Sequence, residues 1–450
     1  MTPLAPRLDR PETPPSDLLI KRAHLIDPRV GIDEPADLLV RGGEVAEVGA
    51  PGSLEAPERA EVVDAEGLHA FPAFVDPHVH LRTPGREDEE DIGSGTRAAA
   101  AGGFCAILAM PNTDPVTDSA SVLLSLRERA REEARVPTGF LAAVTVGQKG
   151  EQLTEMGELI DAGALGFSDD GLPVQSAGVL RQALRYQRMT GGCIALHEED
   201  PTLSRGGSMH EGEVSALLGV GGIPSISEST MIARDAAIAR YEDAQIHIQH
   251  LSARESVQAI EQAKAAGVRI TCEATPHHLT LTEESVRSLD TNFKMNPPLR
   301  SEDDRQALLD GLRSGIIDCV ATDHAPHARE EKEQPFETAP MGVTGLETAF
   351  AALHTMLVIP GLIPLGVLIE RMTAGGAPFG LAIPSLSPGS PANICLADLA
   401  AEWEAGEAGY ESRSSNSCFA GRRLIGRVRM TVAGGSVAYR ERSFAIGAVS

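Results

Sequence analysis

Hydrophobic and polar positions near the two ends of the chain follow the alternation of short β-strands. The apolar stretch Leu38–Val40 leads into Arg41–Gly43, a turn typical of a β-hairpin. Near the end of the chain, Val428–Val432 is a similar strand-like stretch. A small group of strands buries too little core to be stable alone. We therefore predict that residues 17–70 and 383–450 fold together as one β-sandwich domain.

Residues 71–382 instead alternate apolar strands with amphipathic helical stretches. A capping box at Ser252–Glu255 marks the start of one helix. Eight strand-like stretches separated by helices indicate a parallel sheet that closes into a (β/α)8 TIM-like barrel, an α/β fold. The candidate strands are residues 73–79, 104–110, 139–144, 164–168, 193–197, 245–250, 268–273 and 317–322.

Composition narrows the classes of function. The formal net charge of −25 argues against binding to nucleic acid or to an acidic membrane surface. No apolar run reaches the length of a membrane span, and the six cysteines show no CxxC spacing, so we expect a cytoplasmic chain with reduced thiols. Solubility accounts for the acidic surface, and adaptation to a salt-rich cytoplasm is the alternative. Residues 1–16, with five prolines, are expected to form a disordered tail.

Histidines and aspartates follow the predicted strands at their carboxyl ends, where the active site of such a barrel lies. A lone His-x-His pair is weak evidence, but the side chains of His78 and His80 alternate onto the same strand face, and further candidates end other strands. These are Asp169 or Asp170, His197, His250 and Asp323. Imidazole and carboxylate suit Zn²⁺ or a similar divalent ion. Six ligands exceed one tetrahedral zinc, which favours two bridged ions.

Seven motifs, taken in order, resemble those of dihydroorotases of the class I, long-chain bacterial type in the amidohydrolase superfamily. The resemblance runs from about residue 18 to 440, with Thr83 in place of an acid often seen there and Asn393 in place of an aspartate. The motifs are Asp76–Arg82, Met110–Thr113, Gly166–Gly171, His197–Asp200, Ile248–Ser252, Asn296–Arg300 and Ala321–His327.

The resemblance implies a role for each candidate. One or two Zn²⁺ ions are expected, the first held by His78, His80 and Asp323 and the second by His197 and His250. Asp170 would bridge them, with Asp169 as the alternative, and Asp323 would act as general base and acid. The implied substrate-binding residues are His80, Arg82, Asn112, Asn296, His327, Met341 and Gly342.

Many relatives bridge their metals with a carbamylated lysine from the fourth strand. This chain has no lysine between Lys149 and Lys264, so that device is not expected. Of His277 and His278, one is expected to support the ligands and the other to lie on the surface. Residues 329–337 are expected to form either a lid or a solvated loop.

The implied reaction is the reversible, zinc-dependent cyclisation of N-carbamoyl-L-aspartate to (S)-dihydroorotate in pyrimidine biosynthesis. Two alternatives stay open: another cyclic amidase, resembling an allantoinase or a hydantoinase, and a partner-dependent scaffold of aspartate carbamoyltransferase. The family also implies a homodimer and an association with aspartate carbamoyltransferase.

Overall fold

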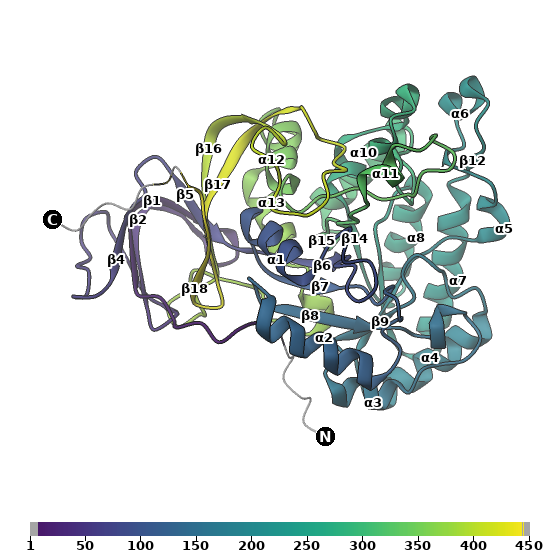
Figure 1. The fold of residues 1–450 in the computed structure, drawn as a ribbon, viewed down its shortest axis with the longest axis horizontal. Coiled ribbons are helices and arrows are strands. Elements are labelled where there is room, and N and C mark those ends of the chain that lie inside the picture. Colours follow the sequence, from purple (N-terminus) through teal and green to yellow (C-terminus); the bar gives the residue numbers. More distant parts are fainter. Residues whose placement is uncertain (1–7, 443, 445–450) are drawn as a thin grey trace.

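Eight parallel strands form the centre of the molecule in the computed structural model, which describes residues 8–442 and 444 (Figure 1). A parallel bridge between Val79 and His324, with the His80 amide donating to the His324 carbonyl at 2.9 Å, joins the two edge strands. The predicted (β/α)8 barrel is confirmed. Its strands are β6 (Phe74–Val79), β7 (Phe104–Ala109), β8 (Thr138–Ala142), β9 (Gly166–Ser168), β10 (Cys193–Leu196), β13 (Gln245–Ile248), β14 (Arg269–Ala274) and β15 (Cys319–Val320).

Amphipathic helices pack around these strands, which are apolar because both of their faces are buried. None of the helices in the described part of the chain has the length and hydrophobicity that a membrane span requires. The main helices are α1 (Ile92–Ala101), α2 (Ala120–Glu133), α3 (Met156–Ala162), α4 (Ala177–Thr190), α7 (Ile226–Glu242), α8 (Arg254–Ala265), α10 (Glu302–Ser314) and α13 (Leu365–Thr373).

Shorter elements lie in the loops between them. They are α5 (Pro201–Ser204), α6 (Glu213–Leu218), α9 (Pro276–Thr280), α11 (Arg329–Lys332), α12 (Ala349–Leu353) and the strand pair β11 (Met209–His210) and β12 (Gly222–Ile223). The predicted capping box before α8 is wrong. Ala253 occupies the N-cap position, and the Ser252 hydroxyl instead donates to the buried carboxylate of Glu228.

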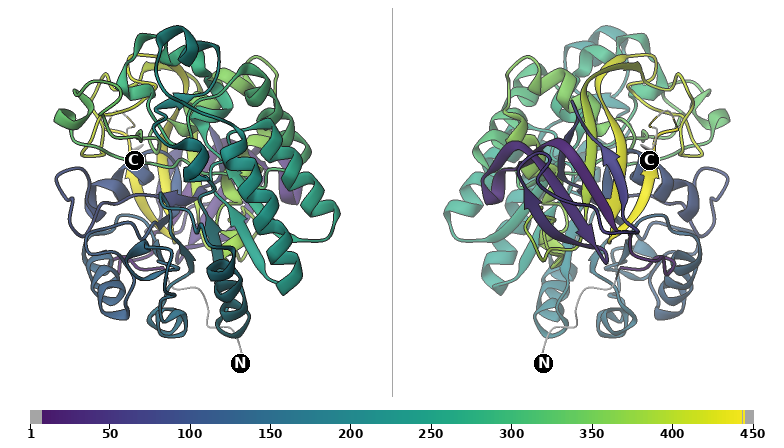
Figure 2. Two further views of the ribbon diagram at one scale, coloured as in Figure 1. Left: turned by 90° about the vertical axis from the view of Figure 1, so that its right-hand side faces the viewer. Right: turned by 90° about the vertical axis from the view of Figure 1, so that its left-hand side faces the viewer.

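The two ends of the chain join in a second sheet, as the sequence predicted (Figure 2). Antiparallel pairing between β16 and β5 connects them, with Ile394 opposite Pro72. Apolar side chains such as Leu38 and Val432 fill one core beneath the sheet. Along the sheet the strands are β18 (Ser436–Arg440), β17 (Arg423–Ala433), β16 (Ile394–Glu404), β5 (His69–Pro72), β1 (Leu18–Asp27), β2 (Ile32–Arg41) and β3 (Glu44–Gly49), and β4 (Glu61–Asp64) also pairs with β1.

The expectation of disorder over residues 1–16 is wrong for residues 8–16, and residues 1–7 lie outside the described residues. Asp9 pairs with Thr138 beside β8, through N–O contacts of 2.8 and 3.0 Å. Its carboxylate accepts a 2.6 Å hydrogen bond from the buried guanidinium of Arg127. A buried guanidinium needs a carboxylate partner, so this ion pair ties the segment to the barrel.

Candidate active site

The six predicted ligands converge at the carboxyl ends of the barrel strands, and each is at most 7% exposed. Two sets of three side chains each offer ligand atoms that lie within 4.8 Å of one another. The first set is His78, His80 and Asp323, and the second is His78, Asp170 and His250. The strand ends therefore bring together the side chains that the sequence placed on five different strands.

Asp170 lies in the middle of this cluster. Its Oδ1 is 3.4 Å from His78 Nε2, 3.6 Å from His197 Nδ1 and 3.6 Å from His250 Nε2. Its Oδ2 is 3.5 Å from His80 Nε2. Burial alone would raise the pKa of Asp170, but the imidazoles, His78 foremost, hold it well below its usual range.

The neighbouring Asp169 faces away from the histidines. It accepts hydrogen bonds from the Val144 amide at 2.8 Å, the Thr145 amide at 3.1 Å and the Thr145 hydroxyl. Burial raises the pKa of Asp169 to about 6. Asp169 therefore anchors the loop after β8, and of the two aspartates Asp170 is the one that faces the candidate ligands.

Asp323 follows β15, with Oδ1 3.1 Å from His80 Nε2 and 3.4 Å from His78 Nε2. Three residues of this region have left-handed backbone conformations, with φ of 47° at Asp323, 30° at His250 and 55° at Arg82. Such values are strained for side chains of this size and concentrate at functional sites. Here they direct side chains into the mouth of the barrel.

The cluster fits one or two divalent metal ions. His78 Nε2 and Asp170 Oδ1 are buried and find no hydrogen-bond partner among the described residues. Leaving such atoms unsatisfied costs free energy, which a cation between them would remove. The opposite nitrogen of His78, Nδ1, lies 2.7 Å from Glu273 Oε1, and Glu273 Oε2 also contacts His247. A carboxylate behind the imidazole is the usual support of a metal-binding histidine.

Two predicted substrate-binding asparagines contact the candidate ligands directly. Asn112 Oδ1 lies 2.9 Å from His80 Nδ1, and its Nδ2 donates to Asp170 at 3.3 Å. Asn296 Nδ2 lies 3.3 Å from His197 Nε2. Both amides thus border the metal site.

The remaining predicted substrate-binding residues lie together on loops of the barrel mouth. Arg82 Nε donates to the Pro326 carbonyl at 3.0 Å, and its Nη2 lies 3.4 Å from His327 Nε2. That imidazole nitrogen also lies 2.9 Å from the Met341 carbonyl oxygen. A Cβ on Gly342 would lie 2.9 Å from His327 Nε2, so only glycine allows this close approach.

His277 and His278 are both buried, so the expectation that one lies on the surface is wrong. His278 is held between the Thr275 hydroxyl and the Pro297 carbonyl, at 2.8 and 2.9 Å. Burial holds the pKa of His277 well below its usual range. The contacts with Thr275 and Pro297 account for His278, whereas His277 Nε2 is buried without a hydrogen-bond partner among the described residues.

Several buried polar residues that support the mouth were not predicted from the sequence. Lys294 Nζ donates to the carbonyls of Phe336 and Ala339 at 2.6 and 2.7 Å, and Lys332 Nζ donates to that of Gly342 at 2.9 Å. These contacts hold residues 329–342, part of which was expected to be a lid or a solvated loop.

Two further missed residues, Glu89 and Asn416, also support the mouth. Asn416 Nδ2 donates to the carbonyls of Ala325 and Gly342, both at 3.1 Å. None of these four residues belongs to a motif, and each is marked in the sequence by its polar type alone.

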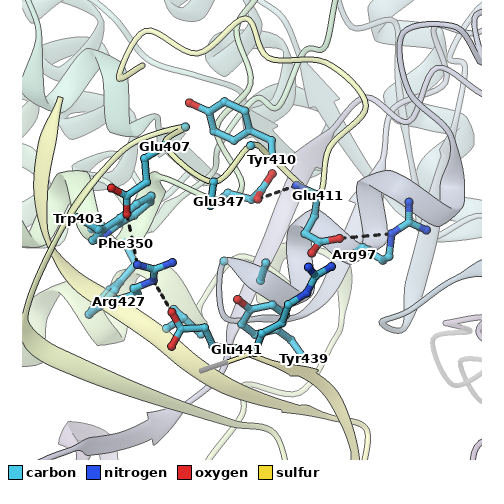
Figure 3. A pocket seen from close by; sticks show the side chains of 18 of the residues that line it. Arg97, Glu347, Phe350, Trp403, Glu407, Tyr410, Glu411, Arg427, Tyr439 and Glu441 are labelled. Atoms are coloured by element: carbon cyan, nitrogen blue, oxygen red, sulfur yellow. Dashed lines mark hydrogen bonds and ion pairs between the residues drawn. The ribbon is translucent and has the colours of Figure 1, made fainter. Parts of the chain in front are cut away.

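A cavity of about 850 Å³ lies away from this cluster, where the second sheet meets the barrel (Figure 3). Aromatic and charged side chains line it, among them Glu347, Trp403, Tyr410, Arg427 and Tyr439. None of the six candidate ligands is among its lining residues. This cavity is therefore not where the candidate metal ligands gather.

Comparison with known proteins gives the same family throughout the chain. A family model described as dihydro-orotase-like matches residues 68–256. A dihydroorotase from Geobacter metallireducens is 44% identical over 425 residues, which cover 94% of this chain and 100% of that protein. A dihydroorotase from Bacillus licheniformis is 43% identical over 94% of this chain and 98% of its own length.

Solved structures agree with the fold. The L-hydantoinase (dihydropyrimidinase) from Arthrobacter aurescens superposes with a TM-score of 0.84 at 26% identity, covering 94% of this chain and 96% of that one. The D-hydantoinase (dihydropyrimidinase) from a Thermus species gives 0.80 at 25% identity, over 96% and 97% of the two chains. The relatives that are more than 40% identical decide between these cyclic amidases, and the chain belongs to the dihydroorotase family.

Proposed function

We propose that this chain is a zinc-dependent dihydroorotase that interconverts N-carbamoyl-L-aspartate and (S)-dihydroorotate. The observation that carries the proposal is the buried Asp170 carboxylate, which faces four imidazoles beside Asp323, with Arg82 at the same mouth. We assign the reaction to pyrimidine biosynthesis in the cytoplasm. A homodimer and an association with aspartate carbamoyltransferase remain predictions.

The six ligands divide naturally into two sets that share a carboxylate. His78, His80 and Asp323 would hold one Zn²⁺ ion, and His197 and His250 would hold a second. Asp170 would bridge the two, because its oxygens face histidines of both sets. Bound zinc lowers the pKa of water towards neutrality and polarises a carbonyl oxygen.

Asp323 is the group that moves the proton in this proposal. In the hydrolytic direction its carboxylate accepts a proton from the attacking water and delivers it to the ring nitrogen as the amide C–N bond breaks. In the closing direction it takes the proton from the carbamoyl nitrogen and gives it to the departing water oxygen. Burial alone would raise the pKa of Asp323, but the neighbouring imidazoles of His78 and His80 hold it below its usual range, so the carboxylate is ionised for this task.

The substrate side supplies recognition of the ring carboxylate. The guanidinium of Arg82 can form two parallel hydrogen bonds with a carboxylate. Asn112 and Asn296 offer amides beside the metal site, and His327 with the backbone of Met341 and Gly342 would close over the ring. A ring without a carboxylate, such as hydantoin, would leave Arg82 without its partner.

The test is the formation of N-carbamoyl-aspartate from dihydroorotate by the purified chain, with bound zinc measured on the same sample. We expect turnover with one or two zinc ions per chain, and its loss in Asp323→Ala. Hydantoin and allantoin serve as competing substrates, and preferential turnover of either would overturn the assignment. Activity that appears only after aspartate carbamoyltransferase is added would support the partner-dependent alternative.

A further inference from the structure

Glu89 is a buried carboxylate that faces the basic groups of the substrate side. It is 2% exposed and lies on the loop between β6 and α1. Its Oε2 is 3.1 Å from Arg82 Nε, and its Oε1 is 2.8 Å from Arg86 Nη2 and 3.3 Å from His327 Nδ1. Burying a carboxylate costs free energy, and the attraction of its three basic neighbours offsets that cost.

These contacts determine how Arg82 is presented. Glu89 and the Pro326 carbonyl both engage Nε, on one edge of the guanidinium. Both partners lie on the Nε edge, so a carboxylate would meet the terminal amino groups, of which Nη2 lies 3.4 Å from His327 Nε2. The Glu89 carboxylate contacts His327 Nδ1, the ring nitrogen opposite the Nε2 that lies 3.4 Å from Arg82 Nη2. Its negative charge therefore offsets the positive charge of Arg82 beside this imidazole.

The next residue, Glu90, supports a different part of the site. Its carboxylate contacts His324 at 3.1 Å, behind Asp323, and accepts from the Arg413 amide at 3.2 Å and from the Ser412 hydroxyl. Two consecutive buried acids are thus directed to separate tasks. Of these two acids, Glu89 is the one that contacts Arg82 and His327, which are assigned to the substrate.

We propose that Glu89 is a positioning residue that fixes Arg82 and His327 for recognition of the ring carboxylate of the substrate. This inference rests on the proposed function, because it assumes that Arg82 binds that carboxylate. It explains why a buried acid lies beside a site that must attract an anion. The negative charge of Glu89 weakens the attraction of the site for an anion, but it holds the Arg82 guanidinium in one orientation before the substrate binds.

The test compares Glu89→Gln with Glu87→Gln, a control on the same loop whose carboxylate contacts the Gly85 amide and Arg129. We expect KM for dihydroorotate to rise about 10- to 100-fold in Glu89→Gln, with kcat within about threefold and zinc content unchanged. Binding of orotate, measured by calorimetry, should weaken by the same factor. Glu89→Asp, which keeps the charge, should recover part of the loss.

Two readouts separate this inference from the proposed function. A wild-type chain that does not turn over dihydroorotate would refute the function, whereas normal KM and orotate affinity in Glu89→Gln would refute the inference alone. Loss of kcat and zinc together would show a general disruption and would also refute it. In ¹⁵N-histidine spectra the His327 ring signals should move in Glu89→Gln and not in Glu87→Gln, whether or not the chain is active.

Discussion

The barrel mouth and the cavity under the second sheet both gather charged side chains, but they differ in how those charges are satisfied. In the cavity, Arg427 forms ion pairs with two carboxylates (Figure 3). Its Nε lies 2.8 Å from Glu441 Oε1, and its Nη1 lies 3.6 Å from Glu407 Oε1. At the mouth, His78 Nε2 and Asp170 Oδ1 are buried without a hydrogen-bond partner in the described part of the protein.

This contrast separates a stabilising region from a reactive one. Partly exposed ion pairs contribute only about 0–1 kcal/mol each to folding. Buried polar atoms without partners oppose folding, and they persist mainly where a ligand completes them. What distinguishes the mouth is therefore the burial of four imidazoles around Asp170 and Asp323, a set of side chains that a cation would complete.

The largest effect is expected when Asp323, the proposed proton-transfer group of the mouth, is changed. Asp323→Asn keeps the shape of the side chain but cannot accept the proton and is a weaker ligand, so kcat/KM should fall at least about 10³-fold. Steady-state assays of dihydroorotate hydrolysis measure this. Asp310→Asn, on the exposed face of α10, should retain wild-type activity. Comparable losses in both variants would contradict the role of Asp323.

The next effect separates the two adjacent aspartates. Asp170→Ala should lose bound zinc and turnover, because Asp170 is the carboxylate that faces the histidines of both sets. Asp169→Asn should keep its zinc but lose about 1–3 kcal/mol of stability, because its amide keeps one oxygen for the Val144 and Thr145 amides but replaces the oxygen that accepts from the Thr145 hydroxyl. Metal analysis and urea unfolding of both variants measure the difference. Zinc loss in Asp169→Asn alone would reverse the assignment.

A smaller effect is expected behind the ligands. Glu273→Gln keeps a hydrogen-bond acceptor for His78 Nδ1 but removes the negative charge, so zinc affinity should fall about 10- to 100-fold. Competition with a chelator measures this affinity. If Glu273→Gln binds zinc as tightly as the wild type, the carboxylate does not support the metal site.

The strand-end ligands were predictable because two simple rules place them. Strand periodicity puts His78 and His80 on one face, and the barrel gathers every carboxyl end at one mouth. Choosing between Asp169 and Asp170 required the family resemblance, since the two residues are adjacent. The structure shows their difference through the partners of Asp169 in the loop after β8.

The supporting residues were not predictable by these rules. Asn416 lies 89 residues from His327 in sequence, yet its Oδ1 accepts from the His327 amide at 3.2 Å. Asp9 likewise accepts a hydrogen bond from Arg127, which lies 118 residues away in sequence. Such contacts are set by how loops and termini pack on the finished barrel, and neither hydrophobic period nor turn chemistry encodes that packing.

The smallest effect on activity is expected in the cavity, where one carboxylate makes stability depend on pH. Glu347 accepts from the amides of Glu411 and Ser412 at 3.0 and 3.1 Å, but burial raises its pKa to about 7. Between about pH 4.5 and 7 the folded chain therefore holds a proton that the unfolded chain has released. The resulting stability is complete below about pH 4.5 and is lost as pH rises through 7, by about 1–3 kcal/mol.

Glu347→Gln cannot titrate, so its urea unfolding free energy should fall less steeply than that of the wild type as pH rises from about 5 to 7. The exposed Glu407→Gln, on the same cavity, should keep the wild-type slope. Both variants should hydrolyse dihydroorotate normally, because the cavity holds none of the ligands. Parallel slopes for wild type and Glu347→Gln would show that this carboxylate is already ionised in the folded protein. A loss of turnover would show that the cavity and the mouth act as one site.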